Sequence, residues 1–120
     1  MYKYGKQKGF TLVEVMIVIL IISILTGMAI PSFLNSRSRA KSRACTENLR
    51  QINQAKEQLA MTNSLAEGTL VTTNQLMPYL HNQQFPTCPS GGIYDLKGVG
   101  TSPTCSIGVS VTPPHTLVQN

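Results

Sequence analysis

Three cysteines and two histidines are the side chains of this 120-residue chain that could ligate a soft metal ion: Cys45, Cys88, Cys105, His81 and His115. Thiolate and imidazole groups are the usual ligands of structural zinc. Zinc motifs of small domains place two ligands within about five residues of each other, and no two of these residues are that close. Cys88 and Cys105 with the two histidines could in principle hold zinc, but no spacing favours that site. The sequence therefore predicts no metal and no cofactor.

The remaining reactive side chains form no catalytic group in the sequence. Ser90 precedes a Gly-Gly pair, but no strand–turn–helix pattern surrounds it and no acid–base partner is evident. Asp95 stands alone among residues 68–120, whereas loops that bind calcium supply several carboxylates. We therefore expect a protein that is not an enzyme.

The odd number of cysteines suggests one disulfide and one spare thiol if the chain is exported. A bond between Cys88 and Cys105 is favoured because it would close a loop of 18 residues and stabilise the fold by about 3 kcal/mol. Cys45 is then a small buried apolar residue, or it is the true partner of one of the other two and joins them to its helix.

Glu14 is a carboxylate inside an otherwise apolar segment. A charge at membrane depth costs about 2–4 kcal/mol unless it is paired or near the interface. Glu14 lies six residues from Lys8, so it could sit at the level of the lipid headgroups. The other interpretation is that it pairs with a cation that another chain supplies.

The segment that carries Glu14 is long enough to cross a membrane. Residues 10–30 number 21, and as a helix they would cover about 31 Å, the thickness of the hydrocarbon core of a bilayer. The segment is longer than the apolar core of a cleavable secretory signal, and no A-x-A-like site follows it. Pro31 should kink or locally open the helix.

The formal net charge of +5 is concentrated before the apolar segment and soon after it. Lys3, Lys6 and Lys8 precede it, and without residues 1–9 the charge would be +2. Four basic residues follow it at intervals of two: Arg37, Arg39, Lys41 and Arg43. On a helix this spacing distributes them around the axis, which favours a solvated collar over contact with anionic lipid or DNA. Under the positive-inside rule, the basic residues before the apolar segment and those after it favour opposite orientations in the membrane, so charge alone does not set the orientation.

Residues 31–64 contain no proline after Pro31 and no glycine, which favours an amphipathic continuation of the helix. A stripe with spacings of three and four predicts the buried face: Cys45, Leu49, Ile52, Ala55 and Leu59. The charged residues are expected on the other faces: Glu47, Arg50, Lys56 and Glu57. The helix should end near Asn63 or Gly68.

Residues 65–112 are expected to form a small C-terminal globular region. A short helix or turn is predicted over residues 73–80, with Leu76 and Leu80 facing the long helix. Strand-like patterns at residues 93–96 and 104–111, separated by glycine turns, predict an antiparallel hairpin. Residues 113–120 are expected to be a flexible tail. The predicted fold class is α+β, a long N-terminal helix with a small C-terminal β-hairpin.

The N-terminal residues resemble the class III signal of type IV pilins and type II secretion pseudopilins. The resemblance covers about residues 1–40. It rests on the run Lys8-Gly9-Phe10-Thr11-Leu12-Val13-Glu14, in which a basic leader ends at Gly9. Counted from Phe10 as the first position, Glu14 is the fifth residue and Pro31 the twenty-second. A second, looser resemblance to short pilin-like proteins lies in the run Cys88-Pro89-Ser90-Gly91-Gly92-Ile93-Tyr94.

The resemblance implies that a prepilin peptidase removes the leader, residues 1–9, by cleaving between Gly9 and Phe10 on the cytoplasmic side, and that the new Phe10 amine is N-methylated. It implies that Glu14 of one subunit pairs with the Phe10 amine of its neighbour, while Pro31 lets subunits loosen to fit.

The protein would then be a single-pass protein of the bacterial cytoplasmic membrane whose C-terminal part faces outward and later enters a filament. Its partners would be other pilins, with an assembly platform and ATPase acting indirectly. The alternatives are a membrane-anchored binding module, such as a DNA-uptake minor pilin, and a signal-anchored protein that is never cleaved.

Overall fold

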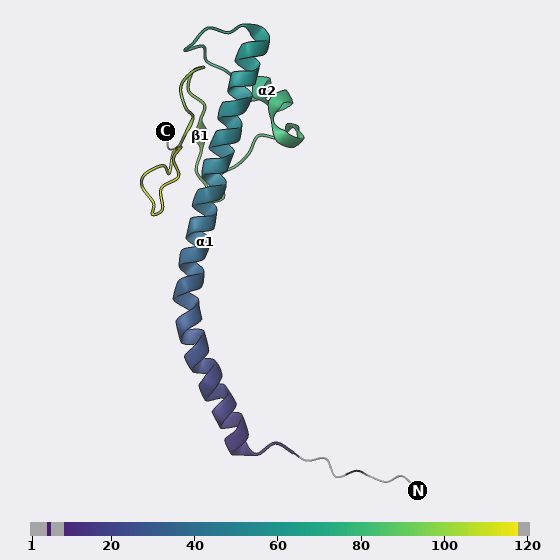
Figure 1. Ribbon diagram of the computed structural model, residues 1–120, viewed down its shortest axis with the longest axis vertical. Helices are drawn as coiled ribbons and strands as arrows, with labels where there is room; N and C mark the ends of the chain where they lie inside the picture. The colour runs from purple at the N-terminus through teal and green to yellow at the C-terminus, as the bar shows by residue number, and fades with distance from the viewer. Residues whose placement is uncertain (1–4, 6–8, 118–120) are drawn as a thin grey trace. The chain divides into compact units, whose positions relative to one another are not determined.

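The computed structural model describes residue 5 and residues 9–117. Most of the expected leader, residues 1–9, lies outside the described residues. The element order is α1 (Leu12–Asn63), α2 (Thr73–Leu76), η1 (Met77–Tyr79), η2 (His81–Gln83), β1 (Tyr94–Asp95) and β2 (Thr104–Cys105). Figure 1 labels α1, α2 and β1. The chain divides into two compact units, Met1–Asn35 and Ser36–Asn120.

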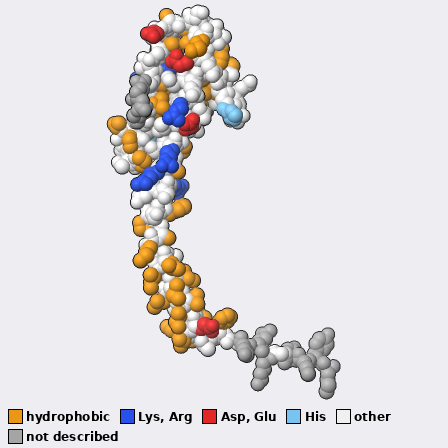
Figure 2. Space-filling view, in the orientation of Figure 1, with side chains coloured by type: hydrophobic (Ala, Val, Ile, Leu, Met, Phe, Trp, Pro, Cys, Tyr) orange, Lys and Arg blue, Asp and Glu red, His pale blue; other side chains and the backbone are white. Residues whose placement is uncertain are grey.

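The first unit is the apolar beginning of α1. Thr11 caps the helix, because its Oγ1 accepts a hydrogen bond from the backbone N–H of Glu14 at 3.3 Å. Every large apolar side chain of α1 from Leu12 to Leu34 is at least half exposed, and Figure 2 shows these side chains covering this part of the helix. Among the described residues, α1 is the helix with enough length and apolar character to cross a membrane, with a mean hydropathy of 2.6 in its most apolar window.

Two hydroxyl residues inside this apolar stretch bond to their own helix. Ser23 donates to the carbonyl of Ile19 at 2.6 Å, and Thr26 donates to the carbonyl of Ile22 at 2.9 Å. These bonds satisfy the hydroxyls without a partner chain. The helix is continuous through Pro31.

The second unit contains the rest of α1, and its core lies along one face of that helix. The predicted stripe is confirmed, since all five of its members are buried: Cys45, Leu49, Ile52, Ala55 and Leu59. The helix ends at Asn63. Ser64 has a positive φ of 49°, and the N–H of Leu65 donates to the carbonyl of Ala60 at 3.0 Å, which is the pattern of a Schellman cap.

The C-terminal elements complete this core. Leu76 and Leu80 are buried in it, as predicted. The hairpin is antiparallel, with Tyr94 opposite Cys105 and Asp95 opposite Thr104. In Figure 1, α2 lies on one side of this part of α1 and β1 on the other. The fold is therefore α+β, a long N-terminal helix and a small two-stranded sheet.

The second strand is shorter than predicted. Strand β2 ends at Cys105, and turns and bends occupy residues 106–112. The N–H of Gly108 donates back to the carbonyl of Cys105 at 3.0 Å, so the chain turns away from β1 at this point. The strand-like pattern of residues 104–111 predicted an extended conformation, but after Cys105 the local turn forms in place of further pairing with β1.

The loop between the strands contacts the connection that follows α1. Gly68 donates to the carbonyl of Val99 at 2.9 Å, and Val99 donates to the carbonyl of Thr69 at 3.0 Å. Gly98 permits this approach, because a Cβ at that position would lie 2.7 Å from the carbonyl oxygen of Gly68. This contact fixes the hairpin loop beside the end of α1.

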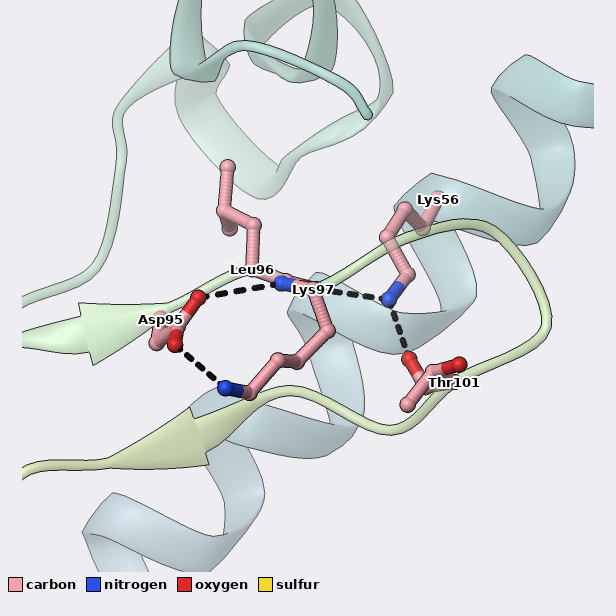
Figure 3. Close-up of polar contacts among 5 residues, drawn as sticks. All are labelled: Lys56, Asp95, Leu96, Lys97 and Thr101. Carbon is pink, nitrogen blue, oxygen red and sulfur yellow. Dashed lines mark hydrogen bonds and ion pairs between the residues drawn. The ribbon is translucent and has the colours of Figure 1, made fainter. Parts of the chain in front are cut away.

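Lys56 is buried, although the sequence placed it on a solvent-facing side of the helix. Its side chain is 0% exposed, and its ammonium donates to the carbonyls of Leu96 at 2.7 Å, of Gly98 at 3.0 Å, and of Thr101. Figure 3 shows the ammonium reaching into the loop between the strands. Burial lowers the pKa of Lys56 from its ordinary 10.5. The three acceptors match the three N–H donors of an ammonium, which explains how this position tolerates a charge.

The expectation of a flexible tail does not hold for residues 113–117, because these residues pack along α1. Three hydroxyl residues of α1, four apart, donate to alternate carbonyls of the tail: Ser38 to Thr112, Ser42 to Pro114 and Thr46 to Thr116. Four helical residues rise about 6.0 Å and two extended residues about 6.6 Å, so the two repeats match. Residues 118–120 lie outside the described residues.

The carbonyl contacts of Lys56 predict that Lys56→Met destabilises the second unit. The substitution keeps the length of the side chain but removes the donor to the carbonyls of Leu96 and Thr101, while that of Gly98 keeps the N–H of Thr101. We expect a loss of at least about 2 kcal/mol in the free energy of unfolding. Urea denaturation of the full chain in detergent, followed by circular dichroism, measures the change.

Lys97→Met is the matched control. Lys97 lies on the same loop and forms an exposed ion pair with Asp95 at 2.6 Å (Figure 3), so its loss should shift the denaturation midpoint little. Equal midpoints for both variants would contradict the structural role of Lys56.

Candidate functional site

The predicted processing residues lie directly before α1. Gly9 and Phe10 are both exposed, and Phe10 is 83% exposed. An added Cβ at Gly9 would meet no atom within 4 Å. The backbone on both sides of the predicted cut is therefore open to an approaching peptidase.

Glu14 lies in the first turn of α1, where the unpaired N–H groups of the helix favour a negative charge. With Thr11 it forms the sequence pattern of a capping box, T-x-x-E. Among the residues that the structure describes, none forms an ion pair with the Glu14 carboxylate. The carboxylate thus remains available to a cation from outside the described chain.

The basic residues after the apolar segment are on the surface of the second unit. Arg37, Arg39 and Arg43 are exposed and Lys41 is half-buried. None of the ion pairs within the described part of the chain involves them. Their distribution fits the solvated collar that the spacing of two predicted.

The second unit brings together four buried metal-ligating side chains from four segments of the chain. We call them the cysteine–histidine cluster: Cys45, Cys88, Cys105 and His115. Their sulfur and nitrogen ligand atoms all lie within 4.8 Å of one another, and the Cys88 Sγ lies 3.7 Å from the His115 Nδ1. The three cysteines are free thiols in this structure. The disulfide between Cys88 and Cys105 stays a prediction.

Two cysteines of the cluster have opposite pKa shifts. Burial raises the pKa of the Cys45 thiol from 9.0 to about 12, against the opposing effect of the Tyr94 hydroxyl. Burial also acts to raise the pKa of Cys88, but hydrogen bonds from the backbone N–H groups of Ser90 and Gly92 and from His115 outweigh it and lower that pKa to about 6. The backbone N–H groups that follow Cys88 therefore favour its thiolate form.

The cluster also depends on residues that shape its walls. A Cβ at Gly92 would lie 2.5 Å from the Cys105 Sγ, so only glycine fits there. The Tyr94 hydroxyl lies 3.6 Å from the Cys45 Sγ and accepts a hydrogen bond from the Asn48 amide at 3.1 Å. Gly92 and Tyr94, which follow Cys88 in the sequence, thus both lie against cysteine sulfur atoms.

Sequence reasoning considered Cys88, Cys105 and the histidines for zinc but left Cys45 out of that set. His81 is exposed and lies apart from the cluster, whereas His115 belongs to a segment that was expected to be loose. Two features of the sequence could have indicated the cluster. Cys45 is a third cysteine on the predicted buried stripe, and His115 directly follows the pair Pro113-Pro114.

Comparisons with known proteins assign the N-terminal segment. Residues 4–30 match the family model of the prokaryotic N-terminal methylation motif. The chain is 40% identical over 52 residues to the type IV major pilin protein PilA of Myxococcus xanthus, a match that covers 43% of this chain and 24% of that protein.

It is also similar to the type II secretion system core protein G of two bacteria. The identity is 32% over 69 residues with the protein of Vibrio cholerae, covering 58% of this chain and 47% of that protein. It is 26% over 108 residues with the protein of Klebsiella pneumoniae, covering 79% and 77%. The matches to PilA and to the Vibrio protein thus span less than half of those relatives. No solved structure matches the chain.

The methylation motif lies where the structure has an exposed segment, a capped helix start and an apolar surface. The chain thus carries the prokaryotic N-terminal methylation motif over residues 4–30 and is similar, over the matched segments, to a type IV major pilin and to type II secretion core proteins.

Proposed function

We propose that this chain is a structural subunit of a filament of the type IV pilus or type II secretion pseudopilus kind, and that it assembles through the first part of α1. The observation that carries the proposal is the exposure of apolar side chains on every face of the helix from Leu12 to Leu34. Such a surface needs lipid or other helices around it. A subunit that moves from the membrane into a helical bundle meets both requirements.

The comparisons give more support to the pseudopilus than to the pilus. The similarity to core protein G of Klebsiella pneumoniae extends over 79% of the chain and so reaches the C-terminal region, whereas the similarity to PilA covers 43%. The shared N-terminal segment supports assembly in either system.

In this function a prepilin peptidase cleaves between Gly9 and Phe10 and the Phe10 amine is methylated. The match to the methylation motif over residues 4–30 supports both steps. The leader remains on the cytoplasmic side and the second unit lies outside. Neighbouring pilins surround α1 in the filament, while an assembly platform and its ATPase drive assembly.

Glu14 sets the axial register of the filament by pairing with the Phe10 amine of a neighbouring subunit. The carboxylate in the first turn of α1, which forms no ion pair with a residue that the structure describes, supports this role. Two charges at membrane depth cost less as a pair than separately. Pro31 adjusts the helix where subunits pack.

Processing predicts the N-terminus of the mature chain. Protein isolated from membranes of cells that contain the peptidase should begin at Phe10 and carry one methyl group on its amine. Edman degradation and intact-mass measurement determine both. A mature chain that begins at another residue would contradict the proposed cut, and a chain that keeps residues 1–9 would favour a simple signal anchor.

Charge pairing predicts that Glu14→Gln remains in the membrane but enters filaments at least about tenfold less, because the Phe10 amine would be left unpaired at membrane depth. Glutamine can still complete a capping box, so this variant separates the charge from the helix cap. Glu14→Ala and Glu14→Val should fail to the same extent. Immunoblots of sheared filaments and of membranes measure the two fractions.

Glu47→Gln is the control, since Glu47 is an exposed glutamate of the same helix that pairs with Arg50 at 2.8 Å. It should assemble normally. Normal filaments from Glu14→Gln would refute the pairing mechanism, and failure of Glu14→Ala alone would assign Glu14 to helix capping.

A further inference from the structure

We infer that the cysteine–histidine cluster is a structural zinc site that fastens the C-terminal segments of the second unit to α1. The cluster supplies three sulfur atoms and one imidazole nitrogen, which is one of the standard ligand sets of structural zinc. Soft thiolate ligands also disfavour magnesium and calcium, which prefer oxygen. The inference concerns the second unit alone and does not depend on filament assembly.

The geometry of the cluster is close to that of a tetrahedral site. With zinc–sulfur bonds of about 2.3 Å and zinc–nitrogen bonds of about 2.0 Å, the edges of the tetrahedron are about 3.5–3.8 Å. The Cys88 Sγ and the His115 Nδ1 are already 3.7 Å apart, and all four ligand atoms lie within 4.8 Å of one another. Small side-chain adjustments would complete the site.

Burial makes this a closed site. The exposed fractions of the four residues range from 0% to 7%, so the protein fills every coordination position. Zinc sites that catalyse reactions keep one position open to water or substrate, whereas structural sites do not. The inferred ion therefore has a structural role.

Outer hydrogen bonds suit thiolate ligands. The Tyr94 hydroxyl lies 3.6 Å from the Cys45 sulfur and donates toward it. Three thiolates and one Zn²⁺ leave a net charge of −1, which such donors disperse.

The fourth ligand is held in place by bonds of its own segment. The backbone N–H of His115 donates to the carbonyl of Gly108 at 2.7 Å, and the carbonyl of the preceding Pro114 accepts a hydrogen bond from Ser42 at 2.7 Å. His115 is thus presented to the cluster by the contact of residues 112–116 with α1. A histidine in a loose tail would have no such orientation.

The second unit needs a cross-link of this kind. Its sheet has two strands of two residues each, and a two-stranded hairpin is marginally stable by itself. Small domains commonly add a metal or disulfides to a core of this size. A zinc ion would join α1, the turn before β1, strand β2 and the C-terminal segment at one point. A disulfide would join two of these segments and leave one thiol and the histidine unused.

The first experiment measures metal and thiols in the full processed chain, purified in detergent without a histidine tag or chelator. We expect about one zinc ion per chain by plasma mass spectrometry. Exchange with Co²⁺ should give the visible absorption of tetrahedral cobalt–thiolate coordination. After chelation and without reductant, alkylation should modify all three cysteines. Absence of zinc and of the cobalt spectrum, or one alkylated cysteine, would overturn the inference in favour of a disulfide.

The second experiment tests the ligands with paired variants. His115→Ala should reduce zinc content or cobalt absorption at least about tenfold, as should Cys45→Ser. His81→Ala is the matched control, because His81 is exposed and lies outside the cluster, and it should bind one zinc ion as before. Unchanged metal binding by His115→Ala would remove His115 from the site. The cobalt spectrum of the unmodified chain keeps the test valid if a variant fails to fold.

The third experiment distinguishes a zinc site from a disulfide by the reagent, a chelator or a reductant, that destabilises the second unit. A strong chelator should lower the thermal unfolding midpoint of the second unit by at least about 10 °C, and added Zn²⁺ should restore it. A phosphine reductant alone should leave the midpoint unchanged. The reverse pattern, sensitivity to reductant and none to chelator, would refute the zinc site.

Discussion

Several backbone carbonyls of the C-terminal region accept hydrogen bonds from side chains of α1. A region with so few strand pairs would otherwise contain many unsatisfied carbonyls, which are costly when buried. The long helix supplies donors along its length: Ser38, Ser42, Thr46, Asn48 and Lys56. The helix therefore provides an apolar stripe and also supplies hydrogen-bond donors to carbonyls that neighbouring strands would satisfy in a larger sheet. This dependence explains why loops, rather than a larger sheet, can cover the core.

The same dependence positions the cysteine–histidine cluster. Cys45 lies on the buried stripe of α1, and the donors on either side of it hold the segments that carry the other ligands. Ser42 bonds beside His115, and Asn48 bonds to the carbonyl of Thr87, next to Cys88. The cluster and the hydrogen bonds thus support each other, since loss of either would loosen the same loops. Its formation is a property of the tertiary fold rather than of any local motif.

Much of the fold follows from the sequence, and the exceptions have physical reasons. The exposed apolar helix and the stripe from Cys45 to Leu59 follow from composition and spacing. Lys56 does not, because a lysine beside an apolar stripe is usually solvated, and only the carbonyls of a distant loop make its burial possible. The cysteine–histidine cluster was not predicted for a similar reason, since its four members come together from positions far apart in the sequence. The processing segment needed no tertiary structure to be recognised, because its signal is local.

The wide separation of the ligands along the chain has a consequence for the order of events during export. In the proposed orientation, Cys45 lies on the helix whose first part is in the membrane, and His115 crosses after the other three ligands. The inferred metal site could then close only after nearly the whole second unit had emerged. A subunit that stalled during translocation would lack its final ligand and remain open to proteolysis. Coordination would thus act as a check that the domain is complete before it is used for assembly.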